Sequence, residues 1–318
     1  MKLAVLVLAG AIGAFTSQTS RAADWGNNGE INAFHVQGNV YLLVGAGGNI
    51  AVQTGDEGVL VVDTGLAQHA DKVLAAIRKL SDKPIRYIIN TNLDPDHTGG
   101  NEVIGKAGST TQGGPTTVIA HENVLSRMSA AVGKPGAAAP GLWPSDTYFP
   151  EEKDLYFNGE ALFLYHDAAA HTDGDSIVLF RRSDVLVAGD AFVMTSYPVI
   201  DQVNGGSVQG VLKSLNRLLA LAVPAHEQEG GTYVIPGHGR VCDEADVLEY
   251  RDMVTIIRDR IQDMVKRGLT LDQVKAAKPT LDYDLHYGSD TGPWTTAMFI
   301  EAVYKDLSRP PARPATRQ

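Results

Sequence analysis

Hydrophobic residues in the first half of the chain form short runs, and a stretch with helical spacing follows them. The run Val40–Val44 precedes two apolar segments, Asn49–Thr54 and Val59–Asp63, which flank the sequence GDEG at residues 55–58. A short glycine-containing turn between two apolar runs is typical of a β-hairpin. Apolar residues at helical spacing then predict a helix over Gln68–Leu80.

The same alternation continues toward the end of the chain. Apolar runs predict strands at Ile85–Asn90 and Thr117–Ala120, and Glu122–Val132 has the pattern of a helix. The pair Asn158-Gly159 between two apolar runs predicts another hairpin. Further strands are predicted at Ser176–Phe180, Val185–Ala188 and Tyr233–Pro236, and further helices at Val211–Ala222, Glu244–Lys266 and Thr295–Leu307. This alternation in two similar halves predicts two β-sheets packed together with helices outside.

The first 22 residues have the pattern of an export signal. Lys2 precedes thirteen apolar or small residues, and the sequence SRAA at residues 20–23 resembles a cleavage site. We therefore predict a signal peptide over residues 1–22, one domain over residues 23–308 and a flexible tail over residues 309–318. Export to the periplasm or out of the cell is expected. A stable membrane anchor is not expected, because no later apolar run is long enough.

Composition and charge narrow the class of partner. The chain has 318 residues, of which 44% are hydrophobic and 20% charged, as in ordinary globular proteins. Asp and Glu outnumber Lys and Arg by 37 to 27, a net charge of −10 that argues against nucleic acid as a partner. A small-molecule substrate is expected instead, and the oligomeric state stays open. Cys242 is the only cysteine, so an internal disulfide and a cysteine metal cluster are excluded.

Four polar loops follow directly after predicted strands, where binding and catalytic residues are often placed. They contain Asn90–Asn101, His171–Asp175, Gly189-Asp190 and Pro236–Gly239. The candidate metal ligands in these loops are Asn92, Asp94, Asp96, His97, His171, Asp190 and His238. Imidazole and carboxylate groups together suit zinc, and also iron or manganese. Three carboxylates in one pocket would repel each other unless cations, such as two divalent ions, compensate their charge.

Each of these residues also has a purely structural interpretation. Asp96 is a candidate helix N-cap, Asp94 before a proline is a common turn residue, and Asp190 stands at the end of a strand. His171 and His238, taken singly, are compatible with ordinary hydrogen-bonded histidines. The metal-binding interpretation therefore depends on all the loops meeting in space.

In their order and spacing, the loops resemble the motifs of the metallo-β-lactamase superfamily. The first family motif, His-x-His-x-Asp-His followed by two glycines, is matched at its end by Asp96, His97 and the sequence TGG. The sequence VVDTG matches a further signature, whose Asp63 would support the metal ligands from behind. The resemblance spans Val40 to Arg240. It implies an α/β fold, an αββα four-layer sandwich of two mixed β-sheets with outer helices.

The first motif departs from the family at its first two positions, where Asn92 and Asp94 replace histidines. The resemblance implies two metal sites. The first would consist of Asn92, Asp94 and His171, and the second of Asp96, His97 and His238, with Asp190 shared. An amide oxygen is a poor zinc ligand, whereas a carboxylate is a good one. We therefore expect a tight ion at the second site and a weaker ion at the first.

The resemblance implies a hydrolase that uses one or two zinc ions, with iron or manganese as alternatives. A bound ion lowers the pKa of water and polarises a carbonyl oxygen, while Asp96 would orient the water and accept its proton. Asp190 resembles branches other than the dedicated lactamases. An ester, lactone or thioester is therefore the expected substrate, with β-lactam hydrolysis as a side activity.

Two other functions remain open. The carboxylate at Asp94 is similar to an iron-containing redox branch of the family, and the loss of two histidines is compatible with a non-catalytic binding protein. Trp143, Tyr148 and Tyr197 are candidate substrate-pocket residues, with anchoring of the core as their alternative role. The loop Gly133–Pro144 is either a lid or a plain insertion.

Overall fold

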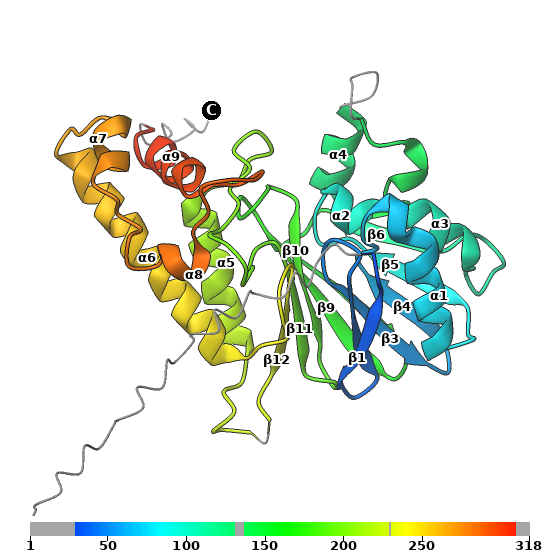
Figure 1. The fold of residues 1–318 in the computed structure, drawn as a ribbon. Coiled ribbons are helices and arrows are strands. Elements are labelled where there is room, and N and C mark those ends of the chain that lie inside the picture. The colour runs from blue at the N-terminus through cyan, green and yellow to red at the C-terminus, as the bar shows by residue number, and fades with distance from the viewer. Residues whose placement is uncertain (1–28, 131–136, 229, 310–318) are drawn as a thin grey trace, which may run out of the picture.

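The computed structural model describes residues 29–130, 137–228 and 230–309 (Figure 1). The predicted export signal lies outside the described residues, as does the predicted tail beyond residue 309. Part of the predicted loop Gly133–Pro144 also falls outside them. In the part of the chain that is described, no helix has the length and hydropathy needed to cross a membrane.

The first sheet has seven strands in sequential order from β1 to β7. The neighbours from β1 to β4 are antiparallel, and those from β4 to β7 are parallel. The strands are β1 Asn32–Gln37, β2 Val40–Val44, β3 Ile50–Gly55, β4 Gly58–Val62, β5 Ile85–Ile89, β6 Thr117–His121 and β7 Asp146–Tyr148. The sheet is therefore mixed.

The second sheet has five strands in the order β12-β11-β10-β9-β8. All its pairs are antiparallel except β11 with β12. The strands are β8 Glu152–Phe157, β9 Glu160–Asp167, β10 Asp175–Phe180, β11 Val185–Gly189 and β12 Tyr233–Pro236. This sheet is mixed as well.

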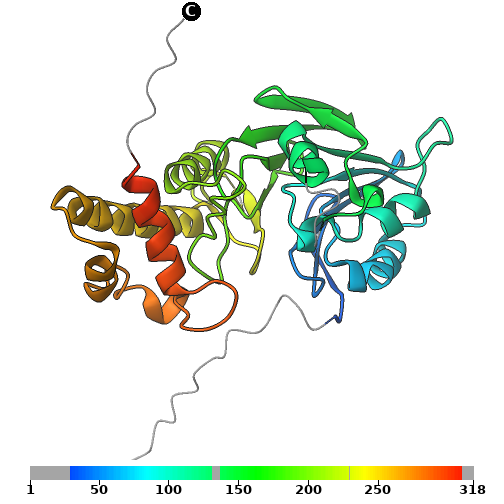
Figure 2. The same cartoon turned by 90° about the horizontal axis from the view of Figure 1, so that it is seen from above.

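Helices cover the outer face of each sheet, so the predicted four-layer sandwich is confirmed. Figures 1 and 2 show the early helices on one side of the sheets and the late helices on the other. The first layer contains α1 Ala70–Leu80, α2 Pro95–Thr98, α3 Asn101–Ala107 and α4 Glu122–Ala130. The second contains α5 Val208–Leu221, α6 Glu244–Lys266, α7 Leu271–Ala276, α8 Asp284–Tyr287 and α9 Thr296–Leu307. Short 3₁₀ helices are η1 Ala67–His69 and η2 Pro140–Leu142.

Three apolar clusters hold these layers together. Leu60, Val62 and Ile89 of the first sheet pack between the sheets against residues such as Phe180 and Ile235 of the second. A second cluster joins the outer face of the first sheet to α1 and α3, and a third joins the second sheet to α5, α6 and α9. Removing this apolar surface from water is the main force that fixes the sheets relative to each other.

The local signals in the sequence explain most of the elements. Asn158 and Gly159 both adopt positive φ, as the two-residue hairpin between β8 and β9 requires. Helix α5 begins at Val208, before its predicted start, because the Ser207 side chain accepts a hydrogen bond from the Gly210 backbone. Helix α6 has its predicted bounds and begins with a capping box.

Candidate metal centre

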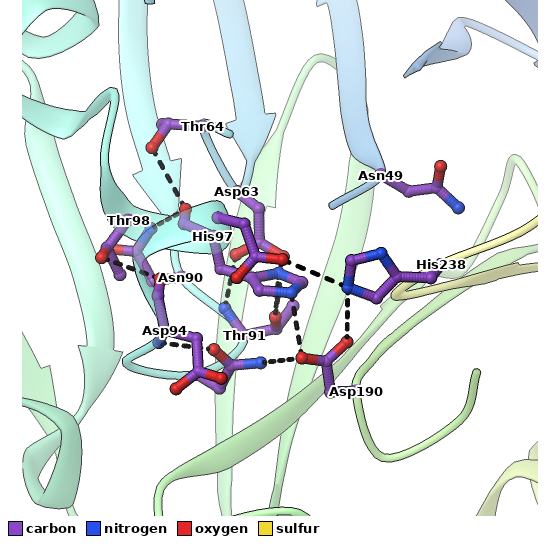
Figure 3. Close-up of polar contacts among 12 residues, drawn as sticks. Asn49, Asp63, Thr64, Asn90, Thr91, Asp94, His97, Thr98, Asp190 and His238 are labelled. Atoms are coloured by element: carbon purple, nitrogen blue, oxygen red, sulfur yellow. Dashed lines mark hydrogen bonds and ion pairs between the residues drawn. The ribbon is translucent and has the colours of Figure 1, made fainter. Parts of the chain in front are cut away.

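The polar loops meet at one edge of the sandwich (Figure 3). Loops after β4, β5, β11 and β12 reach this edge from the ends of their strands, and the loop between β9 and β10 reaches it as well. The structure brings together two groups of possible ligands, within each of which the ligand atoms lie within 4.8 Å of one another. The groups are Asp96, His97, His238 and Asp94, His171, Asp190.

His97 is completely buried and its two ring nitrogens face different carboxylates. Nδ1 lies 2.7 Å from Asp63 Oδ2, and Nε2 lies 3.1 Å from Asp190 Oδ2. With the Nδ1 proton donated to Asp63, Nε2 presents a lone pair, and it has no hydrogen-bond partner among the described residues. A lone pair that faces a carboxylate oxygen at this distance is the arrangement that a cation between them would stabilise.

His171 repeats this arrangement from the second sheet. Its Nδ1 lies 2.9 Å from the Val199 carbonyl, and because a carbonyl only accepts, this nitrogen carries the proton. Its Nε2 then directs a lone pair toward Asp94 Oδ2 at 3.2 Å and Asp190 Oδ2 at 3.9 Å. Two oxygens and one nitrogen therefore converge on one point.

Asp190 lies between the two groups. Its Oδ1 is 3.5 Å from His238 Nε2, while its Oδ2 faces His97 and His171. His238 Nε2 also lies 3.3 Å from Asp96 Oδ2. Asp190 Oδ1 is buried without a hydrogen-bond partner in the described part of the chain. Its position fits the shared ligand that the sequence predicts.

The imidazoles and carboxylates in this centre stabilise each other's charged forms. Burial alone would lower the pKa of His171, but the hydrogen bond to Asp94 and the charge of Asp190 raise that pKa to about 10. Burial alone would raise the pKa of Asp190, but the imidazoles of His97 and His238 hold it well below the usual range for aspartate. Protons and divalent cations therefore compete for the same lone pairs.

The residues fit a metal ion by two structural criteria. Buried, unpartnered ligand atoms of His97 and Asp190 point into the centre. The donors are imidazole nitrogens and carboxylate oxygens, which bind zinc, iron and manganese. Asp63 fixes the ring of His97 from behind, as an outer carboxylate does for a metal-bound histidine.

Asn92 lies beside the centre but does not offer it an oxygen. Its Oδ1 accepts a hydrogen bond of 2.8 Å from the Asp94 backbone, and its Nδ2 faces Asp190 Oδ2 at 3.3 Å. An amide nitrogen does not bind a cation. The expectation that Asn92 is a metal ligand is therefore corrected, and the reason is the competing backbone donor of Asp94.

Several supporting residues were not predicted. Asn49 donates its side-chain amide to the carbonyls of Pro236 and Gly239, and so holds the loop that carries His238 against the first sheet. Thr91 donates to Asp63 from both its backbone and its hydroxyl, at 2.8 and 2.7 Å. These contacts join residues far apart in sequence, and no local motif indicates them.

One glycine beside the centre is required by space. A Cβ atom at Gly237 would lie 2.1 Å from Asp190 Oδ1, so any larger residue would displace the shared carboxylate. The glycine before His238 in the sequence PGHG therefore belongs to the construction of the centre.

Two of the predicted pocket aromatics lie in the core instead. Tyr148 packs between the sheets and its hydroxyl bonds Ser176, whereas Tyr197 packs against Phe299 beneath the late helices. Trp143 is half-buried against Val124 and Met128 of α4 and Ala120 of β6, and it donates to the Ala138 carbonyl. The expectation that Tyr148 and Tyr197 line the substrate pocket is wrong, because their apolar surface is used to join secondary-structure elements, whereas that for Trp143 stays a prediction.

A cavity opens beside the centre, and its lining does not include the three predicted aromatic residues. It measures about 390 Å³ and reaches Asp94 and His171. Its apolar wall includes Val203, Trp294 and Met298, and helix α9 supplies part of that wall. The late helices thus contribute to the surroundings of the metal centre.

The family model of the metallo-beta-lactamase superfamily matches residues 35–238. The chain belongs to the metallo-beta-lactamase superfamily. The motifs that match the superfamily in the sequence are those that form the centre. Helices α6, α7, α8 and α9 lie beyond the matched residues.

This superfamily member is similar in sequence to an alkylsulfatase. A linear primary-alkylsulfatase of Pseudomonas sp. (strain ATCC 19151) is 26% identical over 261 residues, covering 69% of this chain and 47% of that protein. The chain thus spans about half the length of this curated relative.

Solved structures show the same fold. A metallo-beta-lactamase from Pontibacter korlensis matches with a TM-score of 0.57 at 15% identity, covering 71% of this chain and 99% of that one. The stereoselective inverting sec-alkylsulfatase from Pseudomonas sp. matches with a TM-score of 0.60 at 18% identity, covering 86% of this chain and 50% of that one. At these identities the likeness concerns the fold.

The contact between Asp63 and His97 leads to a testable expectation. Asp63→Asn removes the carboxylate that fixes the ring, and metal affinity should fall about 10–100-fold. Titration of the metal-free protein with zinc under a competing chelator measures this change. Thr91→Val, which keeps the carboxylate and removes one of its donors, should have a smaller effect. Equal affinity in wild type and Asp63→Asn would contradict the supporting role of Asp63.

Proposed function

We propose that this chain hydrolyses the ester bond of a small molecule that carries an apolar group. Acyl esters, including lactones and thioesters, are the first candidates. The reason is that Asp190, at the position of the shared ligand, resembles branches of the superfamily other than the dedicated lactamases. The observation that carries the proposal is the cavity of about 390 Å³, whose wall joins Asp94 and His171 to apolar side chains. An apolar group placed there would hold the ester bond beside the centre.

The side chains of the chain have separate tasks in this reaction. The two ligand groups would hold at least one divalent ion, which we propose to be zinc; when bound, it would lower the pKa of water and polarise the ester oxygen. Asp96 is partly exposed, with its Oδ2 3.3 Å from His238 Nε2, so it can orient water and accept its proton. Asp63 and Asn49 hold the loops in place. Export from the cytoplasm stays a prediction from residues 1–22.

A second candidate is a sulfate ester of an aliphatic alcohol. The observation that favours it is the likeness to the linear primary-alkylsulfatase over 261 residues. The cavity suits the apolar part of either substrate, so its shape does not separate the two.

A panel of substrates tests the proposal. Metal-loaded protein is assayed with carboxylic esters of increasing acyl length, a lactone, a thioester, linear alkyl sulfates and a chromogenic cephalosporin. We expect kcat/KM for the favoured ester class to rise roughly fourfold for each added methylene until the cavity is filled. Met298→Glu, at the cavity wall, should remove this dependence while leaving the shortest ester unaffected.

Other outcomes would favour the remaining functions. Turnover that is independent of chain length would remove the role of the cavity. Inactivity toward the whole panel, with zinc, manganese or iron, would favour a non-catalytic binding protein. Oxygen-dependent turnover by the iron form would favour the redox function.

A further inference from the structure

The two ligand groups differ in their donor atoms. Asp96, His97 and His238 supply two imidazole nitrogens and one carboxylate, and Asp190 adds another oxygen. Such a set of four ligands suits tetrahedral zinc. The other group supplies only one imidazole, from His171, and two carboxylates. Ligand sets rich in oxygen suit harder cations such as manganese.

Asn92 increases this difference. Its amide oxygen is occupied by the Asp94 backbone, and its amide nitrogen faces Asp190 Oδ2. Asn92 therefore adds no ligand to the group that contains Asp94.

The two groups also differ in their access to the cavity. Asp94 and His171 line it, whereas Asp96, His97 and His238 do not. An ion bound by Asp94, His171 and Asp190 would have three protein ligands and open positions toward the cavity. Hard cations with octahedral preference fill such positions with water or substrate oxygens.

We propose that the two groups select different ions, with zinc at Asp96/His97/His238 and a hard divalent cation of the manganese type at Asp94/His171/Asp190. The proposal concerns the same centre as the proposed function and refines its metal composition. It does not depend on which ester is hydrolysed. The two parts of the centre would thus contain unlike ions, both in contact with Asp190.

Metal counting tests the proposal. Protein stripped by a chelator is incubated with equal concentrations of Zn²⁺ and Mn²⁺, passed through a gel-filtration column, and analysed for both metals and for the electron paramagnetic resonance of bound Mn²⁺. We expect about one zinc and about one manganese per chain. Asp94→His should replace manganese by zinc, with the manganese content falling about tenfold.

Further variants assign each ion to its group. Asp94→Asn removes the carboxylate without adding imidazole, so it should lose manganese and gain no zinc. His238→Ala should lose zinc and keep manganese. Glu301→His is the matched control, because it places an imidazole in the same cavity outside both groups and should leave both metals in place. Circular dichroism verifies that each variant is folded.

Three results would overturn the proposal. They are wild-type protein with zinc alone, an Asp94→His variant that retains its manganese, and a His238→Ala variant that loses manganese and keeps zinc. Because these measurements count ions, they are independent of the substrate panel. Failure of the ester hypothesis would leave the metal counts unchanged, and failure here would leave the ester assay interpretable.

Discussion

Asp190→Asn should abolish hydrolysis and release most of the bound metal. The Asp190 carboxylate faces His97, His171 and His238 at 3.1, 3.9 and 3.5 Å, so both ligand groups lose a negative oxygen at once. Metal ions contribute several kcal/mol of transition-state stabilisation, so we expect kcat/KM to fall on the order of a thousandfold or more. Steady-state kinetics and metal analysis of the same preparation measure both effects.

Asp184→Asn is the matched control for this experiment. Asp184 directly precedes β11 and Asp190 directly follows it, so the two substitutions alter opposite ends of one strand. Asp184 accepts a hydrogen bond from Thr232 far from the centre, and asparagine tolerates its positive φ. The control should retain metal and activity. An Asp190→Asn enzyme with normal turnover would exclude Asp190 as the shared ligand.

Asp96→Ala should also lower turnover by orders of magnitude, with less effect on metal content at the other group. Asp96 lies 3.3 Å from His238, and the imidazoles of His238 and His97 lower its pKa although burial alone would raise it. A carboxylate kept ionised in this place can accept a proton from water. Loss of a positioned base typically costs ~10²–10⁴-fold in rate.

The pH profile and a nearby control separate this role from a structural one. Glu102→Ala removes an exposed carboxylate that forms an ion pair with Lys106 on α3, close in sequence, and should leave the rate unchanged. Asp96→Ala should flatten the acid side of the kcat profile as well as lowering it. Turnover within a few-fold of wild type, with the profile intact, would remove Asp96 from the reaction.

The sequence predicted the centre of the fold well, for identifiable reasons. The strands that carry the centre are short apolar runs that stop at polar residues, so β5 and β11 and their following loops were visible from pattern alone. Edge elements were harder to detect. Strand β1 was missed because it is largely exposed and has no apolar run.

Short helices and long-range contacts were missed for other reasons. Helix α7 has only six residues, although Thr270 and Gln273 form a capping box that the sequence T-L-D-Q displays. The direction of the Asn92 amide depends on the backbone of Asp94, and the position of Tyr197 depends on packing against a helix about a hundred residues later. Such outcomes are decided by three-dimensional neighbours, which the sequence pattern does not contain.

Each ligand group combines residues from both halves of the chain. Asp94, Asp96 and His97 come from the segment after β5 that contains α2, and His171, Asp190 and His238 come from loops of the second sheet. A shift in how the two sheets pack would therefore move the two sets of ligands relative to each other. The apolar layer between the sheets consequently determines the geometry of cation binding together with the ligands themselves.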